Sequence, residues 1–122
     1  MSREIKFRAW LKNQNKMIKV IQLNLTMENV CDCFFNYYKF NEIEIMQYTG
    51  LKDKNGVEIY EGDIVRCDDE ICSIVWDEPY VTYAISSKEN GNDSLGNFES
   101  KDLEVIGNIY KNKELLENEK TN

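Results

Sequence analysis

The segment from Met46 to Val65, MQYTGLKDKNGVEIYEGDIV, sets three glycines six residues apart between short runs of apolar and polar side chains. Alternation with a period of two is typical of a β-strand that has one buried face. Asn-Gly and Glu-Gly-Asp fill the breaks, and glycine accepts the positive φ angles that tight turns require. The segment therefore predicts closely spaced β-strands joined by short turns.

The same alternation occurs on both sides of this segment. Ile5–Leu11 and Met17–Leu23 flank the polar turn Lys12–Lys16 and predict an N-terminal β-hairpin. Residues 86–102 are polar and predict a long loop. Further strands are expected at residues 42–48, 57–60, 64–67, 71–77, 80–85 and 103–110, the last one interrupted by Gly107.

Residues 26–40, TMENVCDCFFNYYKF, follow a different spacing. Thr26 can cap a helix through its hydroxyl group. We therefore expect a helix over about residues 27–38. The apolar side chains that would share one face of this helix are Met27, Val30, Cys31, Phe34, Phe35 and Tyr38.

Together these elements predict a mainly β chain of the α+β class. Its 122 residues have room for one domain with a single core. Residues 1–45 would form the hairpin and short helix, 46–112 a small SH3-like β-barrel, and 113–122 a polar tail. The barrel is expected because the order of strands and turns after Tyr60 is shared by small SH3-like barrels, which host many functions.

The charge is strongly uneven along the chain. The net charge is −7, but residues 1–20 hold six basic and one acidic side chain, and the other 102 residues hold nine basic and 21 acidic ones. An acidic surface repels phosphate, so nucleic-acid binding is disfavoured. The basic N-terminal hairpin leaves open the alternative of a nucleic-acid-associated accessory protein.

The sequence also predicts where the chain resides. No apolar run approaches the roughly 18 residues that span a bilayer. The first residues, MSREIKFRAW, are charged and lack the apolar core of a signal peptide. We therefore expect no membrane segment and a cytoplasmic location.

Catalytic and metal chemistry find little support. The chain has no histidine, which excludes Ser-His-Asp and Cys-His arrangements. The spacings of the cysteine pairs Cys31/Cys33 and Cys67/Cys72 differ from the paired C-x2-C of structural zinc sites, so reduced cysteines are expected to pack as small apolar side chains. We predict no cofactor, no metal and no catalysis. A carboxylate-dependent enzyme remains an alternative, because acidic side chains crowd residues 58–70.

Aromatic side chains are the remaining candidates for binding a partner. Trp76 is expected to pack, since Ile74 and Trp76 share one face of a strand and alternate with Val75 and Asp77. The hairpin carries apolar groups on both faces, and a two-stranded ribbon is marginal alone in water. We therefore expect a homo-oligomer in which a second copy covers one face. The side chains predicted to contact a partner are Phe7, Trp10, Tyr48, Tyr80 and Tyr83.

Three blocks resemble the YopX family of phage and prophage proteins: REIKFRAW near the start, MQYTGLKDKNGVEIYEGDIV in the middle and LEVIGNIYKNKELL near the end. Residues 22–45 and 86–102 carry no such match. The resemblance implies a phage or prophage origin, a bacterial host cell and a mainly β fold, and it implies no reaction. The favoured function is a non-catalytic module that self-associates or binds a host or phage protein.

Overall fold

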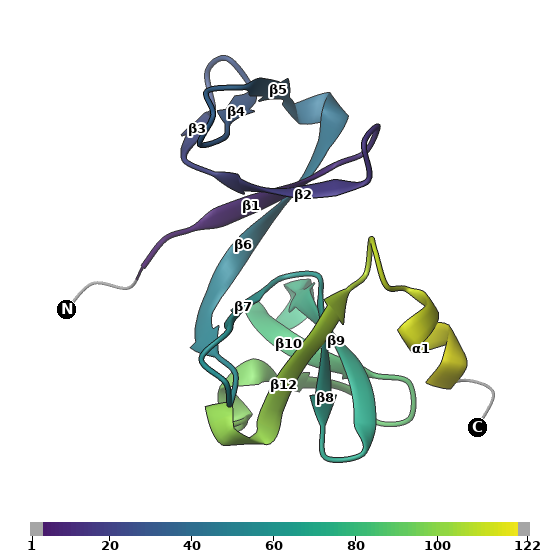
Figure 1. The fold of residues 1–122 in the computed structure, drawn as a ribbon. Helices are drawn as coiled ribbons and strands as arrows, with labels where there is room; N and C mark the ends of the chain where they lie inside the picture. Colours follow the sequence, from purple (N-terminus) through teal and green to yellow (C-terminus); the bar gives the residue numbers. More distant parts are fainter. Residues whose placement is uncertain (1–3, 120–122) are drawn as a thin grey trace. The chain divides into compact units, whose positions relative to one another are not determined.

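The computed structural model describes residues 4–119 and confirms a mainly β chain (Figure 1). The chain divides into two compact units, with the boundary between Tyr48 and Thr49. No helix in the described part is long and apolar enough to cross a membrane.

The first unit contains two antiparallel sheets. In one of them β1 lies between β2 and β6, so that Ala9 pairs with Ile18 on one side and with Ile45 on the other. The other sheet has the order β3-β4-β5. The elements are β1 (Phe7–Leu11), β2 (Lys16–Val20), β3 (Gln22–Asn24), β4 (Asn29–Cys31), β5 (Tyr37–Lys39), the 3-10 turn η1 (Phe40–Glu42) and β6 (Ile43–Lys52), which continues past the boundary.

The small β3–β5 sheet covers one face of the β1–β2 ribbon. Leu23, Val30 and Tyr38 lie opposite one another in this sheet and point to the shared core. The buried members of that core are Ala9, Leu11, Ile18, Val30 and Ile43. On the other face of the ribbon, Trp10 is also buried, with 6% of its surface exposed.

The prediction of a helix over residues 27–38 is wrong. These residues form β4, β5 and the turns around them, and Glu28 and Phe35 have φ angles of +53° and +64°, which no right-handed helix contains. The apolar spacing was misleading because Met27, Phe34 and Phe35 are exposed rather than buried. Asp32 accepts hydrogen bonds from nearby backbone N–H groups, and such local bonds compete with helix formation.

The second unit is built around a five-stranded antiparallel sheet with the order β11-β10-β9-β8-β12, which curls on itself (Figure 1). Its core joins Ile59, Val65, Ile74, Ile85 and Leu103 with neighbouring apolar side chains. The elements are β7 (Glu58–Tyr60), β8 (Asp63–Cys67), β9 (Glu70–Asp77), η2 (Glu78–Tyr80), β10 (Thr82–Ser87), β11 (Gly91–Ser94), η3 (Leu95–Asn97), η4 (Ser100–Asp102), β12 (Leu103–Asn108) and the helix α1 (Glu114–Glu119).

One segment of this unit differs from the expectation. The predicted loop over residues 86–102 in fact contains β11 and the turns η3 and η4, because polar residues can pair as an edge strand when one side faces water. β12 shifts its register between Val105 and Gly107, at the interruption expected there.

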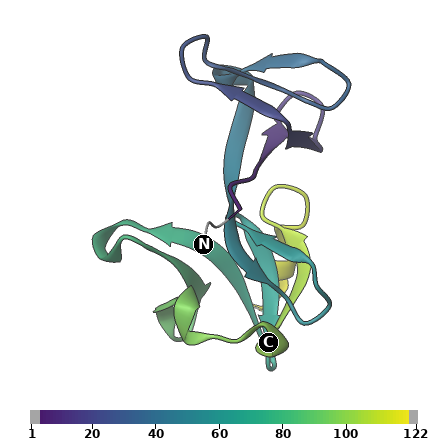
Figure 2. The same ribbon diagram turned by 90° about the vertical axis from the view of Figure 1, so that its left-hand side faces the viewer.

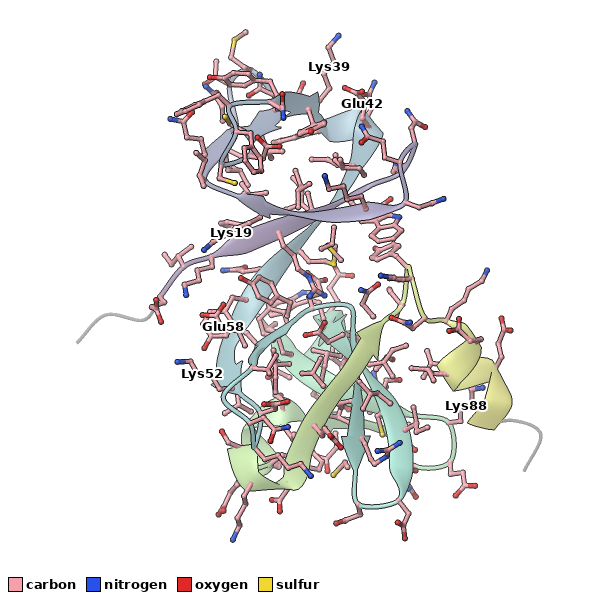
Figure 3. The ribbon with its side chains drawn as sticks, in the orientation of Figure 1. Lys19, Lys39, Glu42, Lys52, Glu58 and Lys88 are labelled. Carbon is pink, nitrogen blue, oxygen red and sulfur yellow. The ribbon has the colours of Figure 1, made fainter. Side chains whose placement is uncertain are left out.

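The helix α1 is tied to the rest of the second unit by a hydrogen bond. Lys88 Nζ donates to the carbonyl oxygen of Leu116 in α1 at 2.6 Å (Figure 3).

Candidate functional site

Exposed apolar side chains concentrate around the β3–β5 sheet. Single exposed apolar residues are normal on any protein, but a concentration of them indicates an interaction site. β4 has three residues and is about 10 Å long, so its two flanking turns are close enough for one partner to cover both. Of eleven large apolar side chains found exposed in the described part, six lie within residues 21–37: Ile21, Leu25, Met27, Phe34, Phe35 and Tyr37.

We call the five most exposed of these, Leu25, Met27, Phe34, Phe35 and Tyr37, the β3–β5 surface. Their exposed fractions run from 62% for Tyr37 to 78% for Phe34. At the end of this sheet, the Lys39 backbone N–H donates to Glu42 Oε1 at 3.0 Å (Figure 3). Glu28 and Lys39 line the same small pocket as Met27, so charged residues adjoin the apolar side chain at this edge of the surface.

The turn that carries Phe34 and Phe35 is held by the buried carboxylate of Asp32. Asp32 Oδ1 accepts the backbone N–H groups of Phe34 and Asn36, each at 2.9 Å. Its Oδ2 accepts from Asn36 Nδ2 and from the Tyr38 hydroxyl, each at 3.3 Å. These bonds, led by the one from the Asn36 backbone and opposed by burial, lower the pKa of the Asp32 carboxyl. The turn is therefore a fixed structure that presents two phenylalanines to solvent.

Phe35 adopts a backbone conformation that its side chain disfavours. Its φ angle is +64°, in the left-handed region, where residues other than glycine, asparagine and aspartate are uncommon. A non-glycine residue there costs on the order of 1–3 kcal/mol. Its side chain is 72% exposed, so burial in the core does not compensate for this cost.

A second turn in the chain has the same hydrogen bonds. In residues 53–57, Asp53 Oδ1 accepts the backbone N–H groups of Asn55 and Val57, each at 2.9 Å. The Asp53 N–H donates to the Val57 carbonyl at 2.8 Å, and the Gly56 N–H donates to the Asp53 carbonyl at 3.0 Å. The equivalent bonds in residues 32–36 measure 3.0 Å and 3.1 Å.

The two turns differ at the residue with positive φ. In the second turn this residue is Gly56, with φ of +81°, and glycine is the residue expected there. In the first turn the same position holds Phe35. The chain therefore places an exposed aromatic side chain at a glycine position, which marks Phe35 as the most informative residue of the β3–β5 surface.

The aromatic side chains predicted from the sequence lie in both units. Trp10 and Tyr48 are buried, each 6% exposed, and Phe7 is half-buried. In the second unit Tyr80 is 78% exposed, whereas Tyr83 is half-buried against the core.

Trp76 combines packing with exposure. It pairs with Tyr83 across β9 and β10, and their rings meet edge to face with centroids 5.0 Å apart. The cross-strand pairing agrees with the expectation that Trp76 packs. Its 44% exposure differs from the buried position expected, because the core ends at Ile74 on this strand.

The sequence reasoning missed the β3–β5 surface, because it assigned Met27, Phe34 and Phe35 to the buried face of a helix. One signal could have corrected this. DCFFN at residues 32–36 can be aligned with DKNGV at residues 53–57, whose turn was recognised from Asn-Gly. The aspartate that begins each turn is the shared feature, and it forms such local bonds readily.

The cysteines do not form a metal site in the described part, where no group of three or more potential ligands is close enough to hold an ion. Cys31 and Cys72 are buried free thiols. Cys67 and Cys72 lie on the two strands of the β8–β9 hairpin but are not opposite each other, because Cys67 pairs with Glu70 and Cys72 with Val65.

The structure thus defines a two-unit β protein that displays an apolar turn in its first unit. A family model described as "YopX protein" matches residues 6–117, and the chain belongs to the YopX family. A similar solved structure is that of protein EF1440 from Enterococcus faecalis, with a TM-score of 0.71 and 29% sequence identity over 94% of this chain and 99% of that one. No curated protein matches the sequence.

Proposed function

We propose that this YopX protein is a non-catalytic binding module that self-associates through the β3–β5 surface. The observation that carries this proposal is Phe35, an exposed aromatic residue held at a glycine position by a buried carboxylate. Strained backbone at an exposed site is a reason to infer function, because stability alone would favour glycine or asparagine there.

The chemistry of the chain supports binding rather than catalysis. There is no histidine to act as a general base. Burial, followed by the charges of Asp68, Asp102 and Glu70, raises the pKa of the Cys67 thiol, and a raised pKa makes a thiol a poor nucleophile at neutral pH.

The curled sheet of the second unit has the strand number of a small SH3-like barrel, a scaffold that hosts many functions.

The size of the β3–β5 surface supports a second copy as its partner. An aromatic side chain buries about 150–250 Å² when it is fully covered, and this surface has three aromatic residues together with Leu25 and Met27. A stable interface buries about 800 Å² on each partner. In a two-fold dimer the same apolar patch meets itself, so no other surface has to be complementary.

The N-terminal ribbon is not the surface that we propose for self-association. Its Ala9 and Ile18 face is covered by the β3–β5 sheet, and Trp10 on the other face is buried as well. A host or phage protein is the alternative partner for the β3–β5 surface. We propose that the protein acts in the bacterial cytoplasm, the location expected from the sequence.

Light scattering coupled to gel filtration tests the proposal over a tenfold dilution series at micromolar concentration. We expect a mass above the 14.4 kDa of one chain, and a return to 14.4 kDa for the double variant Phe34→Ser and Phe35→Asn. Ile5→Ser is the matched control, because Ile5 is 65% exposed and lies outside the surface. A wild-type mass of 14.4 kDa at every concentration would refute self-association.

A further inference from the structure

A small pocket opens at one end of the β3–β5 sheet and has a volume of about 280 Å³. A cavity of about 150 Å³ is enough to hold a benzene molecule, so this pocket has room for one phenylalanine ring. We call it the Met27 pocket. It is lined by Met27, Glu28, Lys39, Phe40 and Asn41.

The residue types of the Met27 pocket favour an aromatic occupant. A methionine sulfur makes favourable contacts with aromatic rings, two rings attract each other edge to face, and an ammonium group is attracted to the face of a ring. Met27, Phe40 and Lys39 supply these three groups. Glu28 and Lys39 carry opposite charges, so the lining as a whole does not require a charged occupant.

The backbone around the Met27 pocket is fixed by hydrogen bonds. The Met27 N–H donates to Asn24 Oδ1 at 2.9 Å. The Phe40 N–H donates to the carbonyl oxygen of Glu28, also at 2.9 Å. The pocket is therefore held in shape before a partner arrives, and such a site loses less conformational entropy on binding than a flexible one.

The Met27 pocket is continuous with the β3–β5 surface. Tyr37 of the surface and Lys39 of the pocket are both exposed, and they alternate with Tyr38, which points to the core. The turn of residues 32–36 joins β4 to β5 at one end of the sheet, whereas the pocket lies at the other end of both strands. Figure 2 shows a turn at each end of this sheet.

The turn of residues 32–36 can be buried without loss of charge hydration. Its one charged side chain, Asp32, is already buried and hydrogen-bonded, and its exposed residues are neutral. Covering the Phe35 ring would bury about 150–250 Å² of surface. This gain would offset the cost of the left-handed backbone at Phe35.

We propose that Phe35 of each copy inserts into the Met27 pocket of the other copy. The inference rests on the self-association proposed above and names the contact that drives it. A two-fold axis that crosses the strands at the central Val30–Tyr38 pair exchanges the two ends of the sheet. Each Phe35 then meets the partner's pocket, and the two insertions are equivalent, as two-fold symmetry requires.

Isotope-filtered NMR on a mixed sample tests this contact. One portion of the protein is deuterated and carries ¹³C methyl groups on its four methionines, and the other portion is protonated. We expect nuclear Overhauser effects between the Met27 methyl group and aromatic protons of the other copy. They should disappear when the protonated portion carries Phe35→Asn and remain when it carries Phe34→Asn. Their absence from a self-associated wild type would overturn the inference and leave the proposed function standing.

A mixing experiment followed by light scattering is the second test. Asn41→Trp fills the pocket and leaves the β3–β5 surface unchanged, because Asn41 is an exposed residue of the pocket wall only. Phe35→Asn removes the inserted ring. Each variant alone should self-associate at least about tenfold more weakly than the wild type, because both insertions are lost. An equimolar mixture should recover part of this loss, since one intact pocket then meets one intact Phe35.

Asn13→Trp is the matched control, because Asn13 is exposed in the β1–β2 turn and lies outside both the pocket and the surface. It should leave self-association unchanged. A mixture that associates no better than either variant alone would overturn the reciprocal insertion, because a contact between the two Phe35 rings gives that result. A wild-type mass of 14.4 kDa at every concentration would overturn this inference together with the proposed function.

Discussion

Phe35 and Gly56 occupy the same position in two turns that share one hydrogen-bond pattern. In each turn an aspartate carboxylate accepts two backbone N–H groups, and the fourth residue has a positive φ angle. Glycine fits this position without strain, whereas phenylalanine does not. The chain therefore contains an internal reference, Gly56, against which the cost of Phe35 can be measured.

Phe35→Asn should raise the free energy of unfolding by about 1 kcal/mol, because asparagine tolerates the left-handed region and the lost phenylalanine side chain is exposed. The same variant should weaken self-association. Phe34→Asn is the matched control, since it removes a similar exposed ring and Phe34 is not among the residues with positive φ. Urea unfolding of both variants decides this, and an equal change in both would contradict the strain at Phe35.

Gly56→Ala should lower the free energy of unfolding by about 1 kcal/mol. The new Cβ meets no atom within 4 Å, so the loss would come from the backbone angle of +81° alone. Gly96→Ala serves as the control, because that glycine has no positive φ and its new Cβ would make only an ordinary contact at 3.7 Å with Ser94 Oγ. Similar unfolding midpoints for the two alanine variants would show that position 56 carries no strain.

The strands were predictable where alternation and turn residues agreed. The segment from Met46 to Val65 shows this, since its glycines at 50, 56 and 62 all have positive φ angles in the structure. The helix over residues 27–38 was not excluded by the sequence, because three- and four-residue spacing of apolar side chains also arises when some of them face solvent. The alignment of DCFFN with DKNGV is the sequence signal for the turn, and the hydrogen bonds of Asp32 show it in the structure. The β3–β5 surface was missed for the same reason, because its residues had been assigned to the buried face of that helix.

The edge strand β11 was not predictable from the sequence. Residues 86–102 are polar, and a polar edge strand has no apolar alternation to reveal its pairing with β10.

Gly62→Val should destabilise the protein by about 1–3 kcal/mol. Gly62 has a φ angle of +88°, and a β-branched residue is a strained outlier in that region. Its N–H donates to the Ile74 carbonyl at 2.8 Å and its carbonyl accepts the Ile109 N–H at 2.9 Å, so the backbone cannot turn away without losing both bonds. Gly62→Asn should lose less, because asparagine tolerates positive φ. An unchanged urea midpoint for the valine variant would refute the strain.

Asp53→Asn should lower the free energy of unfolding by about 1–3 kcal/mol at neutral pH, because it removes an acceptor for buried N–H groups. Asp53 is 3% exposed, and its Oδ2 accepts the Val105 N–H of β12 at 2.9 Å. An asparagine amide group would present a donor to one of these N–H groups instead. The loss should appear as a lower urea midpoint at pH 7.

The stability that Asp53 supplies should also depend on pH. Burial raises the pKa of its carboxyl, but the N–H groups of Val105, Val57 and Asn55 outweigh burial, and the net pKa is lowered from 3.8. A lowered pKa in the folded state means that the carboxylate stabilises the fold fully above the unfolded pKa of about 3.9, and that this contribution is lost as pH falls through the folded pKa.

The difference in unfolding free energy between the wild type and Asp53→Asn should therefore stay constant from pH 7 to about pH 5 and shrink below about pH 4. Asp69→Asn, which changes an exposed carboxylate, controls for the loss of one negative charge. A difference that persists undiminished at pH 3, or that grows in acid, would show that the charge of Asp53 does not contribute to the stability of the turn.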